Sequence, residues 1–128
     1  MVYGVHCMAY SMTYSMELTM TDNEHLQKLK LEMRRGVLIL AVLAELREEH
    51  YGYSLRKRLL SKGLDIDEST LYPLIRRLEK QELLSSEWRE EDKRKKRFYT
   101  LSESGKSILK ELTIQWNDVS SVLNNILK

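Results

Sequence analysis

Hydrophobic and polar positions follow a clear helical period between residues 67 and 80. Apolar side chains recur there at intervals of three and four residues: Leu71, Leu74, Ile75 and Leu78. This spacing places them on one face of an α-helix, for which either Asp67 or Ser69 can serve as the N-cap. The opposite face is polar and basic, with Ser69, Pro73, Arg76 and Lys80 on it and Tyr72 and Arg77 at its flanks. The pattern predicts a helix with one side in the core and the other in solvent.

An earlier and longer helix is predicted to begin at Thr21. The residues from Thr21 to Glu24 match a capping box, in which the two side chains satisfy each other's backbone N–H groups. Gly36 weakens the helix, and a kink or break is expected there. Beyond it, residues 37–46 are apolar nearly all round, so we expect this stretch at the centre of the domain.

A second helix is predicted from near Ser54 to Gly63. Leu55 and Leu59 form its buried stripe, and basic residues line its outside. Gly63 is well suited to end it, because glycine readily adopts the left-handed conformation that follows many helices.

The hydrophobic period changes to two residues after position 83. Side chains alternate over residues 84–89 and again over residues 97–101, which is typical of strands. Two such runs joined by a charged connection predict a β-hairpin, whose tip is expected over residues 90–96.

The last predicted helix starts after Ser102 and continues to about Leu127, a length of about 39 Å. Its apolar residues are spaced alternately by three and four, as in a coiled-coil seam. They are Leu109, Leu112, Trp116, Val119, Leu123 and Ile126. The far end of this seam needs a covering surface, either a second copy of the chain or the chain's own domain. We expect the second copy, and therefore a dimer.

Composition limits the further possibilities. The chain has 128 residues, enough for one domain, and its longest apolar stretch is far too short to span a membrane. Its single cysteine, Cys7, has no partner in the sequence for a disulfide, which favours the reducing cytoplasm. Residues 1–20 contain no Lys or Arg and differ from the rest of the chain. We expect a mobile extension, or the result of an upstream start codon, rather than a segment with a functional role. The expected domains are therefore residues 1–20 as extension, 21–101 as globular domain and 102–128 as dimerisation helix.

The order of elements is helix, helix, helix, hairpin, long helix. This mainly α arrangement with a small β-hairpin (α+β) is that of a winged helix-turn-helix domain, in which the third helix enters the major groove of DNA and the hairpin lies alongside. The net charge is only +2, but cations cluster on the third helix and at the hairpin. The predicted DNA contacts are Ser69, Thr70, Tyr72, Pro73, Arg76, Arg77 and Lys80 on the helix and Lys93, Arg94, Lys95 and Lys96 on the hairpin. A charged run can also be merely a solvated loop.

Several motifs occur at the spacing of a known family. They are Arg35-Gly36-Val37, His50-Tyr51-Gly52-Tyr53-Ser54-Leu55, Ser69-Thr70-Leu71-Tyr72-Pro73-Leu74-Ile75-Arg76-Arg77-Leu78-Glu79 and Tyr99-Thr100-Leu101-Ser102-Glu103-Ser104-Gly105. With them, the chain from about residue 30 to 128 resembles the PadR family of transcriptional regulators. Glu82 departs from the family pattern, which commonly has glycine before the strand, so the shape of this turn is open.

The resemblance implies a homodimeric repressor that a small molecule often releases from DNA. It also implies that Tyr51 and Tyr53 approach the DNA backbone, although Tyr53 could equally belong to the core. Trp116 matches the position where ligand-responsive relatives stack flat aromatic compounds at the dimer interface. Leu112 and Ser120 lie one turn away, and Val37 is the expected opposing surface of this effector site. Plain core packing is the alternative for Trp116.

Two other classes of function are alternatives to DNA binding. A winged-helix module for protein–protein contact would explain the fold, but it would not need the cations of residues 93–97. An enzyme is disfavoured, because the sequence has no phosphate loop, nucleophile motif or metal-ligand spacing. We therefore expect neither a cofactor nor a metal, no membrane association, and duplex DNA with an inverted repeat as the partner.

Overall fold

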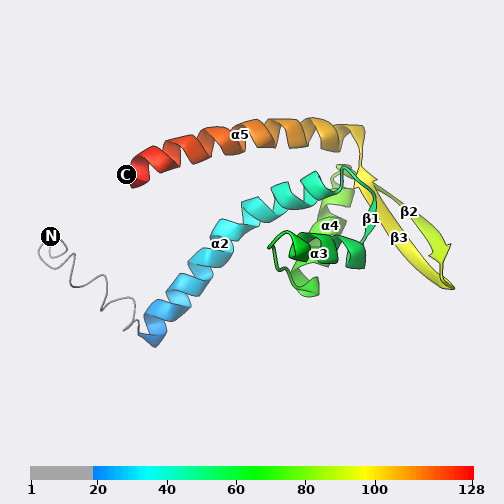
Figure 1. Ribbon diagram of the computed structural model, residues 1–128, viewed down its shortest axis with the longest axis horizontal. Coiled ribbons are helices and arrows are strands. Elements are labelled where there is room, and N and C mark those ends of the chain that lie inside the picture. The colour runs from blue at the N-terminus through cyan, green and yellow to red at the C-terminus, as the bar shows by residue number, and fades with distance from the viewer. Residues whose placement is uncertain (1–18) are drawn as a thin grey trace, which may run out of the picture. The chain divides into compact units, whose positions relative to one another are not determined.

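The computed structural model describes residues 19–128 and contains four helices and three strands in that part of the chain (Figure 1). The predicted mobile extension, residues 1–20, lies almost wholly outside the described residues. The elements are α2 (Met20–Glu45), β1 (His50–Tyr51), α3 (Gly52–Ser61), α4 (Glu68–Lys80), β2 (Leu84–Glu91), β3 (Arg94–Leu101) and α5 (Glu103–Leu127). The expected mainly α fold with a small β-hairpin is confirmed.

Helix α2 begins earlier than the sequence predicted. Its N-cap is Thr19, whose hydroxyl accepts a hydrogen bond from the Asp22 N–H at 3.0 Å. The prediction of Thr21 as the cap was wrong, because Thr21 lies inside the helix. Each threonine lies three residues before an acidic residue (Asp22 or Glu24) and suits a cap, so the local sequence does not distinguish them. The helix runs without interruption through Gly36, and the described residues divide at this point into two compact units, residues 19–36 and 37–128.

The hairpin is longer and its turn tighter than predicted. Strands β2 and β3 pair in register from Leu84 opposite Leu101 to Glu91 opposite Arg94. Only Asp92 and Lys93 remain for the turn, with φ values of 53° and 64°. The predicted tip over residues 90–96 was therefore wrong in extent, because charged residues can pair in a hairpin whose outer half is exposed on both faces. A two-residue turn with positive φ at both positions has the twist that such a hairpin needs.

A third strand joins this hairpin. Strand β1 pairs antiparallel with β3, with His50 opposite Tyr99 and Tyr51 opposite Phe98, so the order in the sheet is β1-β3-β2. The sequence did not predict β1, because two residues are too few to show a period.

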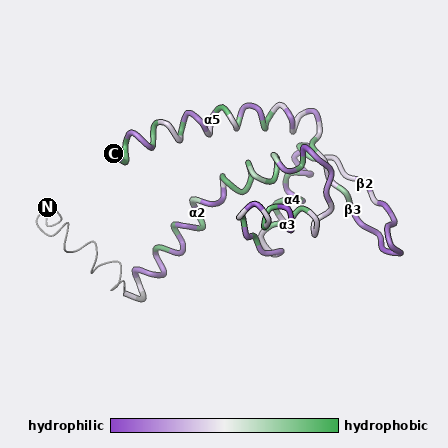
Figure 2. The backbone as a smooth tube through the Cα atoms, viewed as in Figure 1, coloured by the Kyte–Doolittle hydropathy of each residue, from purple (hydrophilic) through white to green (hydrophobic). Residues whose placement is uncertain are grey.

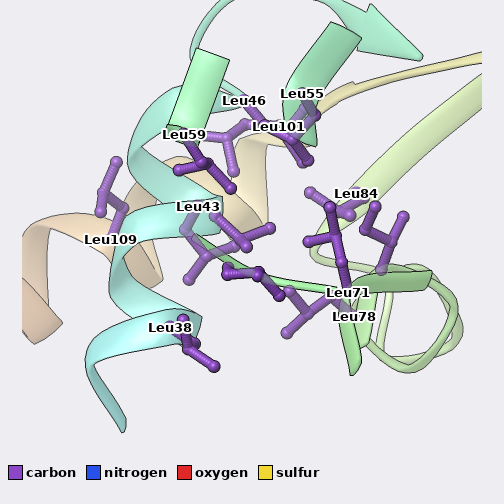
Figure 3. Close-up of a cluster of buried hydrophobic side chains, with 13 residues drawn as sticks. Leu38, Leu43, Leu46, Leu55, Leu59, Leu71, Leu78, Leu84, Leu101 and Leu109 are labelled. Carbon is purple, nitrogen blue, oxygen red and sulfur yellow. The ribbon is translucent and has the colours of Figure 1, made fainter. Parts of the chain in front are cut away.

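The core of the second unit lies between the last turns of α2, helices α3 and α4, and the bases of the strands (Figure 3). Val42, Leu43 and Leu46 are fully buried, as the apolar stretch predicted. The other members of this core are Leu38, Leu55, Leu59, Ile66, Leu71, Ile75, Leu78, Leu84, Leu101 and Leu109. Two hydrogen bonds connect Leu46, the residue directly after α2, to β3: its carbonyl accepts from the Leu101 N–H at 2.9 Å and from the Thr100 hydroxyl at 3.4 Å.

Helices α3 and α4 end in the same way. After α3, Gly63 has a φ of 95°, and the Leu64 N–H bonds the Leu59 carbonyl at 2.9 Å. After α4, Glu82 has a φ of 64°, and the Leu83 N–H bonds the Leu78 carbonyl at 3.0 Å. Both are Schellman ends, in which one left-handed residue reverses the chain. The turn therefore keeps the shape that glycine would give it, although Glu82 occupies the left-handed position.

The start of α5 is fixed to the rest of the second unit. The Ser102 hydroxyl accepts from the Gly105 N–H at 3.0 Å, which confirms Ser102 as the N-cap, and it donates to the Glu82 carbonyl at 2.7 Å. Gly105 is buried so closely that a Cβ atom there would lie 2.1 Å from the Leu83 carbonyl oxygen. Glycine is required at this position by the close approach of the two backbones.

Candidate nucleic-acid interface

Helix α4 presents the polar, basic face that its sequence predicted. Leu71, Ile75 and Leu78 are buried on one side. On the other side Arg76, Arg77 and Lys80 are exposed, and so are Ser69, Thr70 and Pro73. Three cations on one exposed helix face can contact DNA phosphates or guanine edges.

The N-terminal end of α4 differs in one respect from what we expected. Asp67 is the N-cap, and its carboxylate accepts hydrogen bonds from both the Ser69 hydroxyl and, at 2.8 Å, the Thr70 hydroxyl. These two bonds lower the pKa of Asp67. The hydroxyl protons of Ser69 and Thr70 are therefore engaged within the helix cap, and their oxygens are left as hydrogen-bond acceptors.

The hairpin carries its cations along β3 as well as in the turn. Lys93 lies in the turn, Arg94 and Lys95 are exposed on β3, and the Lys96 ammonium lies 4.4 Å from the centre of the Tyr51 ring. Acidic residues stand opposite two of them, because Glu91 pairs with Arg94 and Glu90 with Lys95 in the register. Figure 2 shows this outer part of the hairpin as strongly hydrophilic.

An open hollow separates the hairpin from α3 and α4. It has a volume of about 550 Å³. Its described lining combines aromatic rings with cations: Tyr51, Tyr53, Tyr72, Trp88 and Tyr99, together with Arg76, Lys95, Lys96 and Arg97. Burial raises the pKa of both Tyr72 and Tyr99, so their hydroxyls stay neutral at physiological pH.

Gly52 explains how Tyr72 comes to line this hollow. A Cβ atom at Gly52 would lie 2.8 Å from the edge of the Tyr72 ring. The absence of a side chain at the start of α3 therefore leaves room for the ring of α4. Tyr51 and Tyr53 flank this gap, with their ring centres 6.4 Å apart and nearly parallel. The three residues of the Tyr-Gly-Tyr motif thus form one wall with Tyr72.

Two ion pairs hold the hairpin between its neighbours, one on each face. On one face, Arg97 of β3 donates to Glu79 of α4 at 2.7 Å and to the Ser86 hydroxyl at 2.9 Å, and Ser86 in turn donates to Glu79. Partial burial alone would raise the pKa of Glu79, but the hydrogen bonds from Ser86 and Arg97 and the charge of Arg97 bring it below its ordinary value.

On the other face, the Arg89 guanidinium bonds both carboxylate oxygens of Glu49, at 2.6 and 2.5 Å, and raises its own pKa by doing so. The guanidinium also lies 4.6 Å from the centre of the Phe98 ring. Because Glu49 precedes β1 and Glu79 lies on α4, the hairpin is attached to two separate elements. Its position relative to α4 is fixed by paired, hydrogen-bonded charges.

Sequence reasoning missed Trp88, Arg97 and Tyr99 as residues of this surface. They lie on the same face of the hairpin, since Trp88 pairs with Arg97 and Ser86 with Tyr99 in the register. The alternation over residues 84–89 and 97–101 places these three side chains on one face, but it does not indicate which element that face contacts. The face that turns toward α4 follows from the long-range contacts of the hairpin.

The predicted residues of α5 fall into two groups. Leu109 is buried in the domain core, and Leu112 is half-buried against it. Farther along, Trp116, Val119, Leu123 and Ile126 are 43–71% exposed. Of the expected effector site, Trp116 and Val37 are exposed and Ser120 is half-buried.

The fold and this surface define a class of protein: a winged helix-turn-helix domain with a basic third helix beside its wing. The sequence pattern of the Transcriptional regulator PadR-like family matches residues 39–111. The chain belongs to this family of DNA-binding transcriptional regulators. No helix within residues 19–128 has the length and apolar character needed to cross a membrane.

Solved structures agree with this membership. A PadR family transcriptional regulator from Eggerthella lenta is 38% identical, with a TM-score of 0.78, over 86% of this chain and 98% of its own. A PadR-like transcription factor from Bacteroides fragilis is 34% identical, with a TM-score of 0.67, over 77% of this chain and 98% of its own. Among curated sequences, a Lysinibacillus sphaericus protein is 29% identical over 91 residues, which are 68% of this chain and 82% of that protein.

Proposed function

We propose that the protein is a homodimeric repressor that binds an inverted-repeat operator. Helix α4 enters the major groove through Arg76, Arg77 and Lys80, while the hairpin lies against the backbone through Lys93 to Lys96. Tyr51 and Tyr53 at the start of α3 approach the backbone beside them. The observation that carries this proposal is the exposed basic face of α4 next to a hairpin fixed to it by Glu79 and Arg97.

The DNA contacts are tested by charge removal. Replacing Lys95 and Lys96 together with Gln should weaken binding to all sequences alike and reduce the salt dependence by about one unit of log–log slope per lost phosphate contact. Arg76→Gln should also change the sequence preference if this residue reaches a base edge. Fluorescence anisotropy with labelled duplexes at several salt concentrations measures both effects.

A matched control is the double replacement of Lys106 and Lys110, two exposed lysines on α5, with Gln. It removes the same charge from α5, outside the hairpin, and should change binding little. Equal losses in both double variants would show that net charge, not the wing, determines affinity. Duplex binding absent from the wild type at physiological salt would favour a protein–protein interaction module instead.

Dimerisation is supported by the exposed apolar side chains of α5. Trp116, Val119, Leu123 and Ile126 continue the spacing of the buried Leu109, and exposed apolar stripes of this kind mark interfaces. A two-fold dimer places its α4 helices in successive major grooves, so the half-sites should lie about 10 bp apart, centre to centre.

Leu123→Asp tests the dimer, because a buried charge between two helices is strongly unfavourable. The variant should be monomeric by light scattering at micromolar concentration and should lose operator binding. Asp118→Asn, a polar substitution on the same exposed stretch of α5, is the control and should remain dimeric. A wild-type monomer under these conditions would contradict the proposal.

The effector site is proposed at the dimer interface, with Trp116 as one wall and Leu112, Ser120 and Val37 around it. Two tryptophans from two subunits could stack on a flat ring. In a Trp88→Phe variant, Trp116 is the remaining tryptophan, so its fluorescence reports on this site during titration with planar aromatic cations and phenolic acids. If none of these compounds changes the emission up to about millimolar concentration, Trp116 has a packing role only.

A further inference from the structure

The hollow between the hairpin and helices α3 and α4 has the chemistry of a small-molecule site. Its volume of about 550 Å³ lies within the range of ordinary ligand sites. Four tyrosines and one tryptophan are among its lining residues, and such rings stack on flat ligands. Trp88 contributes the most accessible of these surfaces, since its side chain is 62% exposed.

The charged residues that line the hollow are all positive. Arg76, Lys95, Lys96 and Arg97 line it, and no Asp or Glu is among its described lining residues. Arg97 is already paired with Glu79, at 2.7 Å, which leaves three cations for a ligand. Arg76 donates only a long hydrogen bond, of 3.4 Å, to the Tyr72 carbonyl. The hollow therefore combines aromatic walls with uncompensated positive charge.

We propose that the hollow binds a flat aromatic anion, with a nucleoside monophosphate as the ligand class. The base stacks on Trp88 and the tyrosines, and the phosphate lies between Arg76 and the hairpin lysines. The site is distinct from the one proposed on α5, because none of its lining residues belongs to that helix.

A consequence for regulation rests on the proposed function of the same face. Arg76, Lys95 and Lys96 are also proposed DNA contacts, so ligand and operator compete for the same cations. A nucleotide in the hollow therefore releases DNA by direct competition, without any change in the spacing of the two α4 helices. The apparent dissociation constant for DNA then rises in inverse proportion to the fraction of protein whose hollow is unoccupied.

The two tryptophans allow a direct test on the wild-type protein. Their indole N–H groups give separate NMR signals, which Trp88→Phe and Trp116→Phe variants assign. Adenosine monophosphate should shift the Trp88 signal and leave the Trp116 signal in place. Adenosine, which lacks the phosphate, and ribose 5-phosphate, which lacks the ring, should each bind at least about tenfold more weakly.

Two neighbouring arginines provide a matched pair of variants. Arg76 lines the hollow and Arg77 does not, although both are exposed on α4. Arg76→Gln should weaken nucleotide binding about tenfold, whereas Arg77→Gln should leave it unchanged. Circular dichroism shows whether each variant is folded.

The outcomes separate this proposal from the DNA-binding proposal. Displacement of labelled operator by the nucleotide, with an unchanged Trp116 signal, supports competition in the hollow. If the protein binds its operator but the nucleotide shifts neither signal up to about 10 mM, or shifts Trp116 alone, the hollow is not a nucleotide site. If the nucleotide shifts Trp88 but leaves operator affinity unchanged, the site exists and the proposed competition is wrong.

Discussion

The two halves of α5 have the same apolar spacing and opposite surroundings. The first half, up to Leu112, is capped by Ser102, packed through Gly105 against the Leu83 backbone, and buried at Leu109. The second half has comparable apolar residues, yet Trp116 and Leu123 are 48% and 43% exposed. One continuous pattern therefore has two environments: its beginning completes the domain, and its end is exposed, where we propose that a second chain binds.

This comparison predicts that substitutions in the first half affect folding and that those in the second affect association. Gly105→Val should have the largest effect, because any Cβ there would overlap the Leu83 carbonyl. We expect a loss of about 3 kcal/mol or more in the free energy of unfolding, measured by urea denaturation. Gly36→Ala is the control, since a Cβ at Gly36 meets nothing within 4 Å. A helix interior favours alanine, so this variant should gain about 0.5–1 kcal/mol.

The same leucine-to-alanine change distinguishes the two halves directly. Leu109→Ala should cost about 2–4 kcal/mol at every protein concentration, because it leaves a cavity in the core. Leu123→Ala should alter stability only where the protein is dimeric, so its effect should diminish on dilution. Denaturation curves at several protein concentrations measure this difference. If the loss of stability depends on protein concentration in the same way for both variants, the two halves of α5 do not differ in function.

The cap of α5 is expected to contribute a smaller amount. Ser102→Ala removes the hydroxyl that bonds both the Gly105 N–H and the Glu82 carbonyl, and should cost about 1 kcal/mol in thermal unfolding. Ser104→Ala, at the exposed second residue of the helix, should change stability by less than about 0.5 kcal/mol. Comparable losses in both would mean that serine itself, not its capping position, matters here.

The smallest effect should have the opposite sign. Glu82 adopts a left-handed conformation at the turn that leads toward β2, and its carbonyl accepts a hydrogen bond from the Ser102 hydroxyl. Glu82→Gly removes the steric cost of that conformation and should stabilise the protein by about 0.5–1 kcal/mol. Gly63→Ala, in the equivalent turn after α3, should destabilise it by a similar amount. If Glu82→Gly is destabilising, the Glu82 side chain makes a favourable interaction that outweighs its backbone strain.

Much of the domain could be predicted from local pattern. The amphipathic spacing of α4 identified its buried and exposed faces, and Ser102 identified the start of α5. Strand β1 could not be found in this way, because its two residues form a strand only through pairing with β3. The extra length of the hairpin was missed for a related reason. Its outer residues are charged on both faces and show no hydrophobic period, and the turn at Asp92 and Lys93 determines their pairing.

The individual residues of the candidate interface could be predicted from the sequence, but their positions relative to one another could not. The cations of α4 and of the hairpin stand out in the sequence, and all of the predicted ones except the partly buried Lys96 are exposed. The hollow requires Gly52, Tyr72 and Trp88 to meet from three elements, and no local period contains that information. The ion pairs of Glu49 with Arg89 and Glu79 with Arg97 are likewise long-range.

The hydrogen bonds between α2 and β3 have a consequence for the order of folding. Leu46 and Thr100 are 54 residues apart in the chain, whereas the Ser86–Glu79 bond between the hairpin and α4 spans only seven. Closing the longer loop costs about 2 kcal/mol more in chain entropy. We therefore expect α4 and the hairpin to associate early and the end of α2 to join late. The Leu101 amide bonds the Leu46 carbonyl and not the other strand of the hairpin. Pulse-labelled hydrogen exchange should then show the other amides of the hairpin protected before the amide of Leu101.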